Sequence, residues 1–412
     1  MKTKINKKLI ILITIFFIQG IVTNIHHPLT PAYVANIGLP KYVFGFFFAF
    51  MNIGMMLGGP FWGNLGDSGK KKFAVVAGLS IYGISQALFG MDFIFSQWPL
   101  TLIRIFSGFG IAASFVVINS EIITTSKPGK RARNIAFGAA ALGMGGAIGQ
   151  FLGGFINNNK FVVNLLGTDS FTNVVYLQGA VTLLLALFVF IVFKPEEVVK
   201  DKNKKRTYFW EGFKEIKNVS KELLFFLLSL TFITMAATNV DKFFDDYYNQ
   251  VLGYGTDKLG NFKMIIGFVT VGASLFLVPL FMKIKKKLFL ISIFQVISGV
   301  LVFITFRATG STFLLYLYTL YMAYIVIKAV YAPLEQEHIS TFADDTNITT
   351  TLGIRQSFLS VGTIIGPIAG GFIYEKSPQL LFDTSVILFF LSVGLIFVSS
   401  LLRKKNGEKN II

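Results

Sequence analysis

The sequence predicts an all-α membrane protein with twelve transmembrane helices in two pseudo-symmetric six-helix bundles. Hydrophobic residues make up 53% of the 412 positions and the mean hydropathy is +0.65. Charged residues make up only 14%, whereas soluble domains usually hold about 25%. Apolar runs close to the roughly 20 residues that cross a bilayer recur along the chain. The two halves of the chain also resemble each other, which predicts two related bundles.

Twelve spans are expected from the apolar runs. They lie at residues 8–29, 42–64, 73–92, 98–123, 134–157, 174–194, 222–247, 259–281, 288–308, 311–336, 351–375 and 378–402. A long charged segment separates the sixth span from the seventh, and its Trp210 and Phe213 indicate a short interfacial helix. The expected organisation is an N-terminal six-helix bundle over 1–194, a cytoplasmic central loop over 195–221 and a C-terminal six-helix bundle over 222–412.

The net charge of +17 follows the membrane topology. Most of the 38 Lys and Arg residues lie at the chain ends or in the loops after even-numbered spans, which places both termini in the cytoplasm. We therefore expect contacts with anionic lipids and no nucleic-acid partner. The chain contains no cysteine and no phosphate-binding loop of the G-x-x-x-x-G-K-[ST] type, so neither a metal site nor a nucleotide partner is predicted. Abundant lysine, isoleucine and asparagine favour a bacterial source.

The two halves repeat at a spacing of about 215 residues. Residues 23–27 correspond to 238–242, so that His26 aligns with Asp241. Four glycines of the fifth span also align with four of the eleventh, and these are Gly145, Gly149, Gly153 and Gly154 with Gly362, Gly366, Gly370 and Gly371. Duplicated six-span halves around a midplane cavity are a transporter architecture.

A charged turn joins the second span to the third. Gly69 can adopt a positive φ there, and Asp67 can cap a helix end or pair with a cation. An ordinary basic turn is the alternative. The residues of this turn are Gly63, Asp67, Gly69, Lys70 and Lys71. Their spacing resembles the cytoplasmic loop motif G-x-x-x-D-x-G-[RK]-[RK] of the major facilitator superfamily.

The glycine-rich spans carry a second resemblance. The eleventh span holds Gly353, Gly362, Gly366, Pro367, Gly370 and Gly371. This pattern resembles the antiporter motif of twelve-helix drug:proton antiporters in the same superfamily. In the fifth span Gln150 replaces the proline. Glycines four residues apart form a flat helix face for close packing, and proline adds a kink. The pattern indicates helix pairs that slide or rock during transport, with static packing as the alternative.

Charged residues inside the spans are the candidate coupling and substrate residues. Arg104 begins a segment similar to the family motif R-x-x-Q-G-x-G, and this resemblance implies a role in proton transfer; snorkelling to the outer surface is the alternative. Asp241 is the leading carboxylate for coupling. Its expected depth matches that of Asn24, His26 and Arg104, which makes an exchanging Arg104–Asp241 pair possible. A structural pair with Lys242 and a place in the outer loop are the alternatives.

Two further charged residues, Glu121 and Lys328, have more than one possible partner. Glu121, at the inner end of the fourth span, can meet the Asp67 turn or the cations Lys130, Arg131 and Arg133, or can be a solvated helix end. Lys328, in the tenth span, can bind an anionic group in a cavity or pair with Glu335 or Glu337.

The resemblance to the major facilitator superfamily covers the whole chain. It implies a monomeric transporter of the cell membrane that works by alternating access and uses a proton gradient rather than a cofactor. The leading expectation is proton-coupled export of hydrophobic or amphipathic small molecules. A symporter or facilitator for a small polar or anionic metabolite is the runner-up. A non-transporting receptor or a lipid-modifying enzyme is the alternative outside transport, and the absence of a polar catalytic cluster in the sequence disfavours an enzyme.

Overall fold

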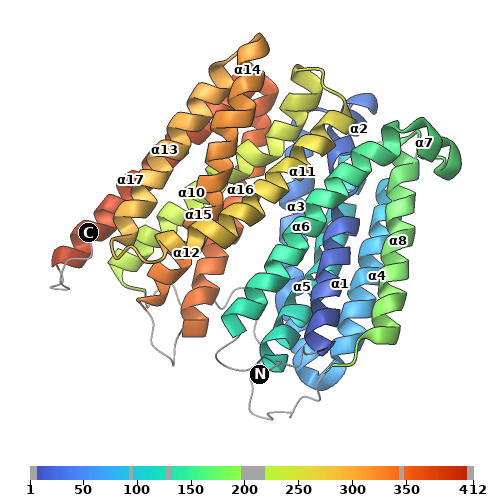
Figure 1. The fold of residues 1–412 in the computed structure, drawn as a ribbon, viewed down its shortest axis with the longest axis horizontal. Helices are drawn as coiled ribbons and strands as arrows, with labels where there is room; N and C mark the ends of the chain where they lie inside the picture. The colour runs from blue at the N-terminus through green and yellow to red at the C-terminus, as the bar shows by residue number, and fades with distance from the viewer. Residues whose placement is uncertain (1–6, 92–95, 127–130, 196–218, 343–347, 406–412) are drawn as a thin grey trace. The chain divides into compact units, whose positions relative to one another are not determined.

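The computed structural model describes residues 7–91, 96–126, 131–195, 219–342 and 348–405. Within these ranges the chain forms helices and turns and no strand. Eleven helical segments are long and apolar enough to cross a membrane. The longest, Tyr42–Phe89, contains two of the expected spans joined by a turn, so the described residues account for all twelve. The predicted all-α membrane fold is confirmed (Figure 1).

The helices of the first half of the chain run from α1 to α8. They are α1 (Lys7–Asn24), η1 (His27–Leu29), α2 (Thr30–Asn36), α3 (Tyr42–Leu65), η2 (Gly66–Lys70), α4 (Lys71–Phe89), α5 (Gln97–Thr125), α6 (Arg131–Asn158), α7 (Lys160–Leu166) and α8 (Phe171–Val192). The second half contains α10 (Lys221–Asp246), η5 (Tyr247–Val251), α11 (Thr256–Gly272), η6 (Ala273–Leu277), α12 (Val278–Phe281), α13 (Lys287–Arg307), α14 (Gly310–Tyr316), η7 (Leu317–Tyr321), α15 (Met322–Ser340), α16 (Ile348–Lys376) and α17 (Pro378–Lys405).

The helices form two compact units. The first unit comprises Met1–Phe209 with Tyr248–Phe268, and the second comprises Trp210–Tyr247 with Val269–Ile412. The predicted boundaries instead keep residues 248–268 with the second bundle. The difference arises because the first half of α11 packs on α6, where Asn158 Nδ2 donates to Thr256 Oγ1 at 2.7 Å. Most of the central loop, with the interfacial helix expected at Trp210 and Phe213, lies outside the described residues.

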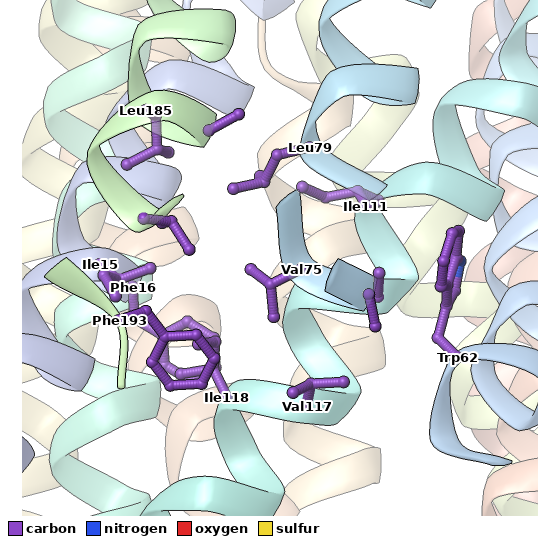
Figure 2. Packing of buried hydrophobic residues seen from close by; sticks show 14 of the residues in the cluster. Ile15, Phe16, Trp62, Val75, Leu79, Ile111, Val117, Ile118, Leu185 and Phe193 are labelled. Atoms are coloured by element: carbon purple, nitrogen blue, oxygen red, sulfur yellow. The ribbon is translucent and has the colours of Figure 1, made fainter. Parts of the chain in front are cut away.

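In the first unit α1 packs on α6, while α3 and α4 both pack on α5. Buried aliphatic side chains from α1, α4, α5 and α8 fill the space between these helices (Figure 2). Trp62 of α3 is buried at the edge of this core, and its indole N–H donates to the Phe109 carbonyl at 2.7 Å. This hydrogen bond satisfies the only polar group that the indole buries.

Two local features differ from the predicted spans. The first span continues beyond residue 29 to Asn36, because Pro28 and Pro31 start new helical turns instead of ending the helix. The short helix α7 was not predicted. Asn159 caps its start by accepting from two backbone N–H groups, and Gly167 ends it with a φ of 64°.

In the second unit α10 packs on both α16 and α17, and α13 packs on α15 and α17. Helix α10 begins directly after the central loop because Ser220 caps it, with Oγ accepting from Leu223 N at 3.2 Å. The glycine stripe of α16 faces the middle of α10, at Thr231, Met235 and Asn239.

Candidate functional site

The turn between α3 and α4 has the geometry expected of its glycine. Gly69 adopts a φ of 90°, a conformation that side chains with a Cβ rarely adopt, and reverses the chain between two long helices. Asp67 is half-buried within this turn and Lys70 is exposed. The proposed gating role of Gly63, Asp67 and the two lysines stays a prediction.

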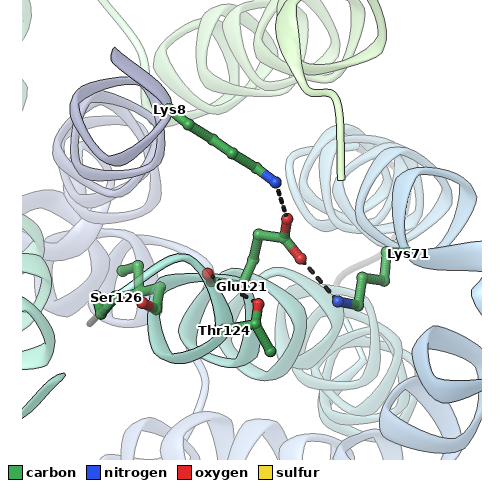
Figure 3. Close-up of polar contacts among 6 residues, drawn as sticks. Lys8, Lys71, Glu121, Thr124 and Ser126 are labelled. Atoms are coloured by element: carbon green, nitrogen blue, oxygen red, sulfur yellow. Dashed lines mark hydrogen bonds and ion pairs between the residues drawn. The ribbon is translucent and has the colours of Figure 1, made fainter. Parts of the chain in front are cut away.

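Lys71, the last residue of the loop motif, points inward and begins α4. Its Nζ lies 2.7 Å from Oε2 of Glu121 on α5, and Lys8 of α1 lies 2.6 Å from Oε1 of the same carboxylate (Figure 3). Glu121 is fully buried. The interpretation as a solvated helix end is therefore wrong, and one carboxylate ties three helices together. The side chains of Lys130, Arg131 and Arg133 lie outside the described residues.

A second ion pair repeats this arrangement in the other unit. Lys287 begins α13 as Lys71 begins α4, and its Nζ lies 2.9 Å from Oε2 of Glu337. Both members are displaced by the same spacing from Lys71 and Glu121, within the range of the internal repeat. This pair was not predicted, because Glu337 was considered only as one of the open alternatives for Lys328. The spacing of the internal repeat would have predicted the Lys287–Glu337 pair.

The glycine stripes lie in helix interfaces, as predicted from their spacing. A Cβ on Gly145 or Gly149 of α6 would meet the backbone carbonyls of Phe17 and Ile21 in α1, and a Cβ on Gly153 would meet the carbonyl of Ile25, just after α1. On α16 the corresponding Gly362, Gly366 and Gly370 face α10, next to Thr231, Met235 and Asn239. Gly154 instead faces Thr256, while Pro367 and Gly371 are buried within α16. Whether these pairs slide during transport stays a prediction.

Arg104 does not snorkel to the surface. Arg104 is only 2% exposed, and its guanidinium donates from Nη1 to Gln86 Oε1 at 3.2 Å. The guanidinium carbon lies 3.6 Å from the centre of the Phe89 ring, a cation–π distance. Gln86 was not predicted as a site residue, although an amide within an apolar span is itself a signal of a polar site.

The residues at the end of the first span gather near Arg104. His26 is buried and stacks on His27 with ring centres 4.4 Å apart. Both histidines line a small pocket together with Arg104. Asn24 instead turns back on its own helix, where its Nδ2 donates to the Gly20 carbonyl at 2.9 Å. Asn24 therefore supports the contact with Gly146 of α6 and does not line this pocket.

Asp241 of α10 forms an ion pair with Lys328 of α15. Neither partner proposed for Lys328 was right, since Arg355 binds Glu335 and Lys287 binds Glu337. The side chains of Asp241 and Lys328 remain 23% and 34% exposed, so neither charge is fully buried. In this structure Asp241 pairs with Lys328 and Arg104 donates to Gln86. An exchange between Asp241 and Arg104 stays a prediction.

The chain has relatives among bacterial drug-resistance proteins. It is 23% identical over 415 residues to Multidrug resistance protein 2 of Bacillus subtilis (strain 168), covering 97% of this chain and 96% of the relative. It is also 23% identical over 419 residues to Quinolone resistance protein NorA of Staphylococcus aureus (strain Mu50 / ATCC 700699), covering 98% and 100%.

Solved transporter structures share the fold. A bacterial homologue of the human lysosomal transporter Spinster, inward-facing and unoccupied, aligns with a TM-score of 0.79 at 15% identity and covers 97% of both chains. A D-xylose-proton symporter aligns with a TM-score of 0.71 at 14% identity and covers 96% of both chains. At this identity the likeness establishes the fold alone.

The duplicated bundles, the turn at Gly69 and the glycine stripes define a multi-pass membrane transporter rather than an enzyme. The family model of the Major Facilitator Superfamily matches residues 12–327, and the chain belongs to this superfamily.

Proposed function

We propose that this transporter exports hydrophobic or amphipathic small molecules in exchange for protons. The observation that carries the proposal is the Asp241–Lys328 ion pair, which joins two spans and stays partly exposed. Both drug-resistance relatives match over nearly the full length of the chain, which supports the proposed substrate class.

The ion pair provides a simple coupling step. When Asp241 is ionised, its charge is balanced by Lys328 and leaving either charge alone in the span costs free energy. When Asp241 takes up a proton, the attraction ends and α10 and α15 are released from each other. Because α10 also packs on the glycine stripe of α16, a shift of α10 reaches the closest helix contacts of the second unit. The proton thereby biases the equilibrium between two packings.

Lys328 supports a second candidate function. An anionic substrate can compete with Asp241 for the ammonium group, which would suit a symporter or facilitator for a small anionic metabolite. The two functions differ in the direction of transport and in the charge of the substrate.

A dye-efflux assay in cells distinguishes them. Cells that produce the transporter are loaded with a lipophilic cationic dye, and efflux is followed with and without an uncoupler. Export that stops when the proton gradient is removed supports the proposal. Unchanged dye retention, together with proton-driven uptake of an organic anion, would contradict it.

The proposal places the protein in the cell membrane as a monomer with both termini in the cytoplasm. Because the chain lacks cysteine, single cysteines report this orientation directly. A cysteine introduced at position 205 is expected to resist an impermeant thiol reagent in intact cells and to react after permeabilisation. Labelling in intact cells would overturn the orientation.

A further inference from the structure

We propose that the groove between α7 and the start of α8 binds one phospholipid with an ethanolamine headgroup. The groove belongs to the first unit and has a volume of about 500 Å³. This volume lies within the range of roughly 300–1,000 Å³ that is usual for ligand pockets. Its lining residues are Leu166, Gly167, Asn173, Tyr176, Leu177 and Ala180. The proposed lipid site contains neither Asp241 nor Lys328 and does not depend on the direction or coupling of transport.

The groove continues the membrane-facing side of α8. Exposed residues follow this helix at intervals of three or four, which places them on one face. They are Asn173, Tyr176, Ala180, Leu183, Leu184, Leu187, Phe188, Phe190 and Ile191. From Ala180 onward the face is entirely apolar, so acyl chains of the bilayer cover it. The groove forms where Ala180 and Gly167 leave room beside larger neighbours, and the acyl chains on this face therefore extend into it.

The polar end of the groove lies at the level of the lipid headgroups. Helix α8 has 22 residues, about 33 Å of helix for a hydrocarbon core of about 30 Å. Asn173 and Tyr176 lie in its first two turns, and tyrosine is typical of the membrane interface. Phe161 and Leu165 of α7 are 76% and 68% exposed, although α7 lies outside the predicted spans at the end of α8 (Figure 1). Such exposed apolar side chains indicate a helix that rests in the interface.

Hydrogen bonds to the end of α6 hold the groove in place. Asn157 Nδ2 donates to the Thr168 carbonyl at 3.0 Å, and Thr168 Oγ1 donates to the Ile156 carbonyl at 2.8 Å. Thr168 directly follows Gly167, whose φ of 64° ends α7. The segment between α7 and α8 is therefore fixed before a lipid binds, which lowers the cost of ordering the site.

The charges around the groove favour a headgroup that carries an ammonium group. Asp169 is exposed and accepts from Asn173 Nδ2 at 3.2 Å, so its carboxylate lies beside the groove. None of the six lining residues is basic. Lys160 begins α7 six residues before Leu166, about 9 Å along the helix. An ethanolamine ammonium can pair with Asp169, while the second amide N–H of Asn173 and the Tyr176 hydroxyl are donors for the phosphate. An anionic headgroup would instead require a cluster of cations.

Native mass spectrometry of the full-length protein in detergent tests the headgroup preference. The probes are phosphatidylethanolamine and phosphatidylglycerol with the same acyl chains. We expect one phosphatidylethanolamine to bind with a Kd about two- to fivefold lower than that of phosphatidylglycerol, the effect of one exposed charge pair. Equal Kd values, tighter binding of phosphatidylglycerol or no bound lipid would overturn the proposal.

Two variants test the assignment of the groove. Asp169→Asn removes the carboxylate and is expected to bind both lipids with the same Kd. Ala180→Trp fills the groove and is expected to bind no lipid at the concentration at which the parent binds one. The matched control is Leu187→Trp, an exposed position on the same face two turns further along α8, which should bind as the parent does.

If Ala180→Trp does not fold, Asp169→Asn decides, because its side chain is exposed and the substitution keeps its size. An Asp169→Asn variant that keeps the parental preference would show that this carboxylate does not select the headgroup. Phosphatidylethanolamine that binds folded Ala180→Trp with the parental Kd would place the lipid outside the groove. Either result would contradict the proposal.

Discussion

The two halves of the repeat place the same kind of ion pair at corresponding helix starts, Lys71 of α4 and Lys287 of α13, in different surroundings. In the first half Glu121 is fully buried, and the Lys71 side chain is 6% exposed. In the second half Lys287 is 10% exposed and Glu337 is 39% exposed. Lys8 adds a second cation to Glu121. The duplicated sequence therefore keeps the register of the pair, while burial decides how much each pair contributes.

The halves also differ at the position shared by His26 and Asp241. The first half has His26 there, in a pocket with a guanidinium that lacks a carboxylate among the described residues. The second half has Asp241, whose charge Lys328 neutralises. The two halves thus place different titratable groups at the same repeat position, a histidine in the first and, in the second, the carboxylate for which proton uptake is proposed.

The largest difference between these two ion pairs is expected in the free energy of unfolding. Glu121→Gln leaves two ammonium groups without their carboxylate in a buried site, which should lower the free energy of unfolding by about 3–5 kcal/mol. Glu337→Gln is the matched change in the other half and should cost at most about 1 kcal/mol, because the carboxylate is partly solvated. Denaturant unfolding of the purified protein measures both. Equal costs would show that burial does not separate the two pairs.

The glycine stripes give a smaller difference. A Cβ at Gly149 would overlap the Ile21 carbonyl, whereas at Gly366 the nearest atom is Met235 Cα at 3.1 Å. Gly149→Ala is therefore expected to cost about 1–3 kcal/mol of stability and Gly366→Ala less.

Gly394→Ala is the control for the glycine comparison, since no atom of another helix lies within 4 Å of its Cβ position. A Gly394→Ala variant as unstable as Gly149→Ala would mean that helix flexibility, and not backbone contact, sets the cost.

Transport by Gly366→Leu is expected to stop, because the larger side chain separates α16 from α10.

The smallest effect on stability, within about 0.5 kcal/mol, is expected from Asp67→Asn. The side chain is half-buried, and the substitution keeps its size. Transport by the variant should nevertheless fall to near background if Asp67 changes partners between conformations. Lys283→Gln, an exposed change in the corresponding turn of the second half, is the control and should transport normally. Normal dye efflux by Asp67→Asn would reduce this residue to a component of the turn.

Periodic features of the fold could be predicted from the sequence. The twelve spans follow from hydropathy, and the positive φ of Gly69 follows from a glycine in a tight charged turn. The contacts of Gly149 and Gly366 follow from glycines spaced four residues apart. These features depend on local chemistry or on a helix face, which the sequence displays directly.

Partners across helices could not be predicted in this way. Pairing Lys328 with Asp241 requires the rotation of two helices that lie far apart in sequence, and hydropathy gives only their depth. The burial of Glu121 similarly depends on Lys8 reaching it from α1. The Lys287–Glu337 pair could have been predicted from the repeat, because it lies at the same spacing from Lys71 and Glu121. The spacing is kept although the charged turn of the second half lacks the aspartate of the first.

The most direct test of the proposed mechanism is proton flux through Asp241→Asn in reconstituted vesicles. Asp383→Asn is the matched control, because it removes an aspartate from the Arg307 ion pair of the same unit. We expect Asp241→Asn to lose substrate-linked proton movement and uphill transport while it retains downhill exchange, and Asp383→Asn to retain all three. If Asp241→Asn moves protons with substrate as well as the parent does, Asp241 is not the coupling site.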